Sequence, residues 1–306
     1  MNTRDVLRRQ GFVFSVLALM VSLLIVMFPA RNSMMETTLL AALIFLLGLP
    51  HGAFDVIFAK RLYRLVSLGQ WAAFCSIYVL LATAVVGLWW VLPSVFLIAF
   101  LLMSAFHFSG DLDDGTSTVL RFWYSGSMLI LPAWFHEAEV ARLFGYLTAG
   151  DFSLQMANIL QSMALPWCFG LGITLIWKWR TNWLTNLEVV SVSLLATAAP
   201  PLIGFTVFFC VMHSARHAVR TRAYAADLLW LDLLKKAVAP MVACALAIAV
   251  LWPTLTGLTF DAAVIRILFV GLAALTVPHM VLIERIRLAG WRDNAAPTPW
   301  SPTFKQ

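Results

Sequence analysis

The sequence predicts an all-α membrane protein, a polytopic transmembrane helical bundle of about ten spans. Of its 306 residues, 61% are apolar and only 12% are charged, whereas soluble globular chains contain about 45–50% apolar and about 25% charged residues. Long apolar runs without charges recur along the whole chain, and such runs are typical of membrane-spanning helices. A single water-soluble domain, a disordered chain and a disulfide scaffold are therefore excluded.

Ten apolar runs follow one another along the chain. The first comes after an arginine-rich N-terminal segment and is about twice as long as the apolar region of a signal peptide, so we expect an uncleaved span. The seventh and eighth runs are short, and Pro200-Pro201 between them prevents one regular helix, so we expect a tight pair of short helices. The predicted spans are Gly11–Ala30, Thr38–Ala59, Gly69–Leu92, Pro93–Gly110, Val119–Phe135, Leu154–Trp177, Leu187–Ala199, Pro201–Met212, Ala237–Trp252 and Ala262–Ile283.

The loop charges orient this bundle. The chain carries 21 Lys and Arg residues against 15 Asp and Glu residues, a net charge of +6. With the N-terminus inside, only Arg31, Arg142 and Arg266 would lie outside, in agreement with the positive-inside rule. A mere kink at Pro200-Pro201 would instead put the basic run from Arg216 to Lys236 outside. We therefore expect both termini in the cytoplasm, with no nucleic-acid partner.

The domain organisation is expected to be simple. Residues 1–290 form one integral-membrane domain, and residues 291–306 form a loose, proline-containing cytoplasmic tail. The four cysteines show no CxxC spacing and are expected to be small buried apolar residues. No buried lysine or arginine is expected, which argues against a charged substrate.

Five of the six histidines fall at one depth of the predicted bundle. His51, His107, His213 and His279 lie in four different spans, about 5–14 Å below the inner polar boundary at ~1.5 Å per helical residue. His217 follows His213 by one helical turn, so both imidazoles share a helix face and can bind one metal ion. Imidazoles without thiolates suit iron, zinc, copper or nickel, and spacing does not choose among them. The sixth histidine, at position 136, lies at the outer end of its span, where we expect no functional role.

Two aspartates stand four residues after span histidines. Asp55 follows His51 and Asp111 follows His107. Each carboxylate is placed to accept a proton from its histidine's second ring nitrogen and so to fix the tautomer that binds metal. The alternative for Asp111 is that it simply begins an acidic loop.

Prolines and aromatic residues surround the histidines. Pro50 and Pro278 each precede one, and a proline bends a helix and frees a backbone carbonyl, which a bilayer tolerates beside protein or a water-filled cavity. The aromatic residues either pack helices or line a long apolar slot for a substrate. The candidates for such a slot are Phe54, Phe106, Phe108, Trp123 and Tyr124.

Four short motifs, in this order, resemble one enzyme family. GLPHGAFD surrounds His51, SAFHFSGD surrounds His107, HSARH contains His213 and His217, and VPHMVLIE contains His279. Together they resemble the Brp/Blh family of integral-membrane beta-carotene 15,15'-dioxygenases, from the second span to the last.

The resemblance implies a ligand set and a reaction. His51, His107, His213 and His217 would bind one Fe(2+), and His279 would be a fifth histidine beside the site. Lipid-dissolved beta-carotene would react with O2 at its central double bond to give two molecules of all-trans-retinal. The resemblance also implies a place in the cytoplasmic (inner) membrane of a bacterium, with a microbial rhodopsin as the retinal acceptor.

Two other functions compete with this interpretation. A haem-binding electron-transfer protein would also use histidines on facing helices, although the nearby aspartates are not expected there. A transporter would use helices broken at proline around a midplane site, but the histidines lie off the midplane.

Overall fold

The computed structural model describes residues 2–28, 34–113, 115–178 and 182–292, and every regular element in these ranges is a helix. The helices of the first half are α1 (Thr3–Met27), α2 (Met34–Leu43), the π-helix η1 (Ile44–Gly48), α3 (Pro50–Ala53), α4 (Asp55–Tyr63), α5 (Leu68–Val91), α6 (Pro93–Ser109), α7 (Thr118–Ile130) and α8 (Pro132–Gly145). The second half contains α9 (Phe152–Trp177), α10 (Trp183–Ala198), α11 (Pro201–Val207), the π-helix η2 (Phe208–Ser214), α12 (Ala215–Tyr224), α13 (Trp230–Leu251), the 3-10 helix η3 (Trp252–Leu255) and α14 (Phe260–Arg292). The predicted all-α polytopic bundle is confirmed.

Among the described residues, seven helical segments are long and apolar enough to cross a membrane, and α6 and α10 are shorter apolar helices. The remaining predicted span, Val119–Phe135, is divided at Pro132, where α7 ends and α8 begins. Proline has no N–H to continue the α7 ladder, but it is well suited to the first turn of a new helix. Of the two spans predicted to be short, the seventh is α10, which has 16 residues, and the prediction is correct for it alone.

The eighth span is longer than predicted. It runs over Pro201–Tyr224, 24 residues, whereas the apolar run ends at Met212. Its second half contains Arg216 and Arg220, which are buried against other helices rather than exposed in a loop. A charge thus marks a helix end only when it faces water or headgroups, and these two arginines face protein.

The chain reverses direction at Pro200-Pro201, as the tight-pair interpretation predicts. Glu188 on α10 and Arg216 on α12 are 28 residues apart in sequence, on either side of the prolines, yet their side chains form an ion pair. A single kinked span would hold them far apart. The alternative of a kink is excluded.

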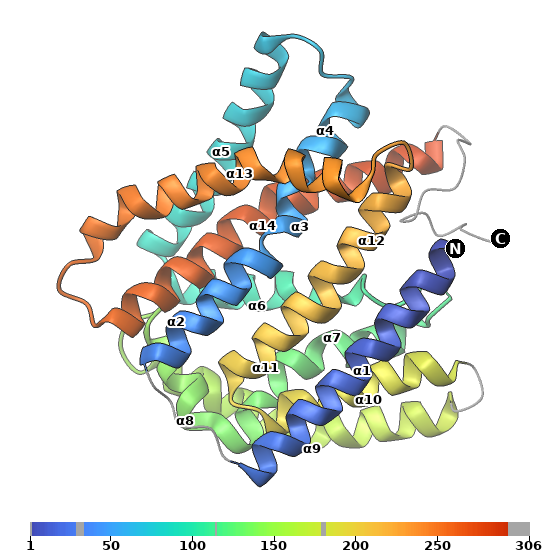
Figure 1. The fold of residues 1–306 in the computed structure, drawn as a ribbon. Coiled ribbons are helices and arrows are strands. Elements are labelled where there is room, and N and C mark those ends of the chain that lie inside the picture. Colours follow the sequence, from blue (N-terminus) through green and yellow to red (C-terminus); the bar gives the residue numbers. More distant parts are fainter. Residues whose placement is uncertain (1, 29–33, 114, 179–181, 293–306) are drawn as a thin grey trace.

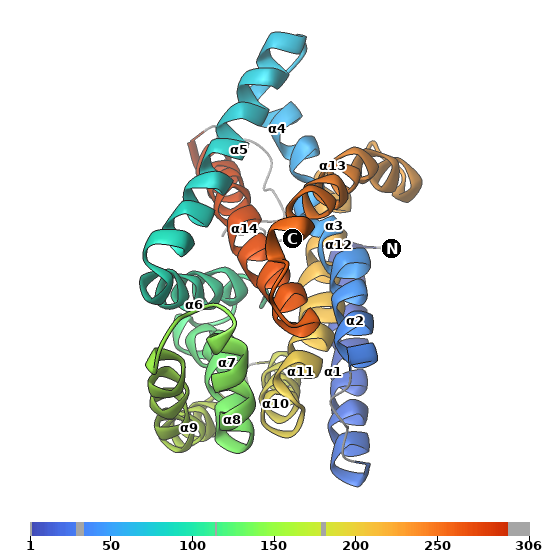
Figure 2. The same cartoon turned by 90° about the vertical axis from the view of Figure 1, so that its left-hand side faces the viewer.

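Figures 1 and 2 show α14 in the middle of the molecule, with α2 and α5 beside it. The α7–α10 helices pack together at one side, and α10 also packs along α1. By contrast, the most apolar stretches of α5 and α13 contain no buried residue, so these two helices present apolar side chains outward, as lipid-facing helices do. The predicted tail, residues 291–306, lies outside the described residues from 293 onward, and residues 291 and 292 still belong to α14.

Candidate metal centre

The five histidines that the sequence places at one depth come together in space. Their elements are far apart in the chain, and four of the histidines are buried while His107 is half-buried. Seven pairs of these rings are neighbours, with centroids from 4.6 Å apart (His107 and His213) to 6.4 Å apart (His51 and His107). The rings are His51 on α3, His107 on α6, His213 on η2, His217 on α12 and His279 on α14.

These separations fit a single metal ion. Two imidazoles bound through Nε2 at ~2.1 Å to one ion have centroids ~4.5 to ~6.5 Å apart, according to the angle between them. Ligand nitrogens of His51, His107 and His279 lie within 4.8 Å of one another. The Nε2 atoms of His107, His213 and His279 are buried and have no hydrogen-bond partner among the described residues. Buried polar atoms are nearly always paired, so a metal ion is the natural partner for such a group of nitrogens.

The other ring nitrogen is engaged in most of these histidines. Nδ1 of His51 lies 2.6 Å from the carbonyl oxygen of Gly48. A carbonyl only accepts, so Nδ1 carries the proton and Nε2 keeps the lone pair that a metal needs. Nδ1 of His217 lies 3.3 Å from the Thr221 hydroxyl, which itself donates to the carbonyl of His217.

The aspartates pair across helices and not within them. Oδ1 of Asp55 lies 2.7 Å from Nδ1 of His279, and Oδ1 of Asp111 lies 2.9 Å from Nδ1 of His213. The expected pairs, Asp55 with His51 and Asp111 with His107, are therefore wrong. An i, i+4 contact needs an unbroken helix, but the helix breaks at Phe54 and α6 ends at Ser109.

Two π-helices shape the centre. In η1 the Leu49 amide donates to Ile44, five residues back, and Gly52 donates to Leu49. The Gly48 carbonyl accepts from His51 and from the Ser214 hydroxyl, 3.0 Å away, which ties η1 to η2. Such π segments are frequent at functional sites because they change the direction of side chains. The sequence showed only the bend at Pro50.

A buried arginine cluster holds Asp111 in place. Arg216 forms a two-point ion pair with Glu188, at 2.5 and 3.2 Å, and donates to the carbonyl of Asp111 at 3.0 Å. Arg220 donates to the carbonyls of Gly110 and Asp111. The expectation that no arginine is buried is thus wrong. Glu188 could have been noticed as a lone carboxylate inside an apolar run.

The five aromatic residues proposed for a slot do not line one surface. Phe106 is 59% exposed on α6, Phe54 belongs to a buried cluster with residues of α4, α13 and α14, and Trp123 packs against Trp167. Phe108 and Tyr124 do lie beside the centre: Phe108 packs edge-on against His213, and the Tyr124 hydroxyl is 3.4 Å from Oδ2 of Asp111. A residue that the sequence analysis missed, Tyr78 on α5, donates to Oδ2 of Asp55 at 2.9 Å.

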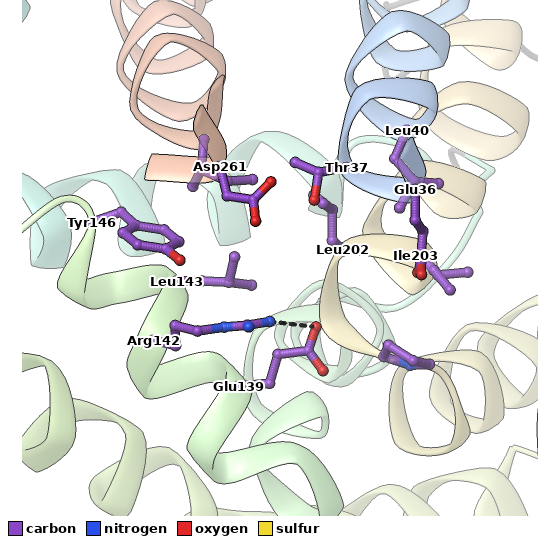
Figure 3. Close-up of a pocket in the computed structure, with 12 residues that line it drawn as sticks. Glu36, Thr37, Leu40, Glu139, Arg142, Leu143, Tyr146, Leu202, Ile203 and Asp261 are labelled. Carbon is purple, nitrogen blue, oxygen red and sulfur yellow. Dashed lines mark ion pairs between the residues drawn. The ribbon is translucent and has the colours of Figure 1, made fainter. Parts of the chain in front are cut away.

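A separate pocket lies at the opposite end of the bundle. Figure 3 shows side chains of α2, α8, α11 and α14 around it, with an ion pair between Glu139 and Arg142. Asp261, on its wall, precedes His279 by five helical turns, ~27 Å at 1.5 Å per residue. His136 also lies on α8, with Nε2 near the Ala198 carbonyl. All these residues are at the end predicted to be outer.

Comparison with known proteins supports the family assignment. The family model described as beta-carotene 15,15'-dioxygenase matches residues 42–287. A beta-carotene 15,15'-dioxygenase from an uncultured marine bacterium is 32% identical over 268 residues, which cover 80% of this chain and 92% of the relative. No solved structure matches. The family match spans all five clustered histidines and both aspartates, and the chain belongs to the beta-carotene 15,15'-dioxygenase family.

Proposed function

We propose that this protein cleaves beta-carotene at its central 15,15' double bond with O2, giving two molecules of all-trans-retinal. The carbon–carbon double bond breaks, and each of its two carbons gains one atom of the O2 molecule, so no other reductant is needed. The observation that carries the proposal is the convergence of buried imidazoles from separate helices in a chain of this family.

The metal is proposed to be Fe(2+), with His51, His107, His213 and His217 as ligands. Imidazole nitrogens suit several first-row metals, and the reaction with O2 favours iron among them. Bound iron would supply the O2 activation that an organic side chain cannot provide. A neutral imidazole adds no charge, so the two nearby carboxylates, Asp55 and Asp111, can offset the charge of a divalent ion.

The protein's own residues orient the ligands and keep water out. The Gly48 carbonyl, the Thr221 hydroxyl and Asp111 each fix one ring through Nδ1. Phe108 and Phe209 pack against His213, and Phe209 also packs edge-on against His51. Held rings leave little to reorganise when O2 and the double bond meet, which is how positioning accelerates a reaction.

Substrate and product are both lipid-soluble. We propose that beta-carotene enters from the bilayer of the bacterial cytoplasmic membrane, between helices, and that a microbial rhodopsin accepts the retinal. Phe106 on α6 is 59% exposed, and the next residue, His107, is the one histidine of the cluster that is only half-buried. We therefore propose that the substrate enters beside α6.

The test is reconstitution. We expect the protein, purified in detergent and loaded with Fe(2+), to bind about one iron and to convert beta-carotene to retinal, measured by chromatography. Protein treated with a chelator should lose the activity and regain it with added Fe(2+). Iron-loaded protein that gives no aldehyde from any carotenoid would refute the proposal, and a Soret band in the purified protein would favour a haem protein instead.

A further inference from the structure

The geometry points to His279 as a further ligand of the metal ion, with Asp55 and Tyr78 as its positioning residues. This inference rests on the proposed function, because it concerns the same ion. It adds a fifth histidine to the four that the motifs suggest as ligands. It also gives a role to Tyr78, to which neither the family match nor the named relative assigns one.

His279 occupies the same kind of place as the other four histidines. It is 1% exposed, and its ring centroid lies 5.3 Å from that of His51, 5.4 Å from His107 and 5.1 Å from His217. Its Nε2 is buried without a hydrogen-bond partner among the described residues, and it belongs to the group of ligand nitrogens within 4.8 Å of one another. A histidine that only positioned a ligand would instead form a hydrogen bond from one of its ring nitrogens to that ligand.

Asp55 prepares His279 for metal binding. Its Oδ1 is 2.7 Å from Nδ1 of His279, so the ring donates there and its Nε2 keeps the lone pair. Asp55 is only 3% exposed. A buried carboxylate at membrane depth is costly unless it is compensated. A divalent ion on the far side of the ring supplies that compensation.

Tyr78 fixes the carboxylate. Its hydroxyl lies 2.9 Å from Oδ2 of Asp55, the oxygen that does not face the ring, and 3.4 Å from the carbonyl of Leu275 on α14. With one oxygen held by α5, the carboxylate cannot rotate away from His279. Tyr78 thus connects an outward-facing helix to the centre.

A second group of histidine, aspartate and tyrosine, hydrogen-bonded in the same order, is built around His213. His213 is paired with Asp111, whose Oδ2 in turn lies 3.4 Å from the Tyr124 hydroxyl. The two His–Asp–Tyr groups come from different elements. His213 lies on η2, Asp111 on the turn after α6 and Tyr124 on α7. His279 lies on α14, Asp55 on α4 and Tyr78 on α5. Because His213 is a proposed ligand, the repeated arrangement indicates that His279 is one as well.

The experiment uses the full chain in detergent and compares four variants. His279→Ala removes the ring, while Asp55→Asn and Tyr78→Phe keep the size of each side chain. Tyr63→Phe is the matched control, because the Tyr63 hydroxyl accepts an exposed hydrogen bond from Arg285 and lies outside the histidine cluster. Each protein is loaded with Fe(2+) and titrated with a chelator, and separately loaded with Co(2+) for its visible absorption spectrum. Size-exclusion profiles and unfolding temperatures confirm that each variant is folded.

We expect His279→Ala to change the Co(2+) spectrum and to lower the metal affinity by about 100-fold. Asp55→Asn should lower the metal affinity by about 100-fold and Tyr78→Phe by about 10-fold. Tyr63→Phe should match the wild type. Folded His279→Ala protein with unchanged affinity and spectrum would overturn the ligand assignment, and unchanged Tyr78→Phe would overturn the positioning role. A wild type that binds metal but yields no retinal would refute the proposed function alone, while the spectra would still decide this inference.

Discussion

At the scale of single residues, the position of a histidine in the bundle decides its role. His213 contacts two other histidines of the cluster and is held by Asp111, whereas His136 lies on α8 near the Ala198 carbonyl. Both are partly or fully buried histidines inside an apolar protein. They lie at opposite ends of the bundle and therefore have different neighbours.

This contrast gives a direct test. We expect His213→Ala to lose most of the bound iron and to reduce retinal formation at least 100-fold, because a ligand is removed. His136→Ala should keep both within about twofold of the wild type. Iron content by elemental analysis and retinal by chromatography measure the two effects. The reverse pattern would show that the cluster is not the metal centre.

At the scale of helices, the Glu188–Arg216 pair connects α10 to α12. Both side chains are buried, and Gly11 on α1 permits this contact, since a Cβ there would collide with the Glu188 carboxylate. Gln10, also on α1, accepts from Arg216 at 2.8 Å. Three helices therefore meet at one ion pair, which also holds the backbone of Asp111.

Removal of one partner should destabilise this junction. We expect Glu188→Ala to lower the free energy of unfolding by about 3–5 kcal/mol, because it leaves the Arg216 guanidinium buried without its counter-ion. Glu139→Ala removes a longer pair, 3.8 Å, with Arg142, whose side chain is 49% exposed while that of Glu139 is 16% exposed, and it should cost less than about 1 kcal/mol. Thermal or denaturant unfolding in detergent compares the two variants. Equal losses would mean that the buried pair is not a structural junction.

The helices also show what a sequence can and cannot predict. The common depth of His51, His107, His213 and His279 follows from counting residues to the nearest charge, so their grouping was predictable. The partners of Asp55 and Asp111 were not predictable. The helix break at Phe54 leaves no trace in the apolar pattern, and the end of α6, although predicted at Gly110, does not show which helix comes to lie beside Asp111. Tyr78 and Arg216 were missed for a similar reason: their roles depend on which helices become neighbours, and that is a property of tertiary packing.

At the scale of the whole molecule, the two ends of the bundle carry different charged side chains. The histidine cluster lies toward the end that carries Arg61, Arg121 and Arg220, and the pocket of Figure 3 lies at the other end, with Glu36, Glu139 and Asp261 on its wall. The positive-inside rule assigns the arginine-rich end to the cytoplasm. The metal centre would then lie in the inner half of the membrane.

Reporter fusions test this orientation. Green fluorescent protein folds in the cytoplasm and alkaline phosphatase is active only outside it, so we expect a C-terminal fusion to fluoresce and a fusion after Leu258, in the turn between α13 and α14, to show phosphatase activity. The reason is that α14 crosses the membrane between these two points, and its predicted inner end carries Arg285 while its outer end begins beside Asp261. Two further fusions serve as controls for the first two spans. The fusion after Phe28 should lie outside the cytoplasm, and the fusion after Val66 should lie in the cytoplasm. A fluorescent Leu258 fusion would invert the topology and place the histidine cluster in the outer half of the membrane.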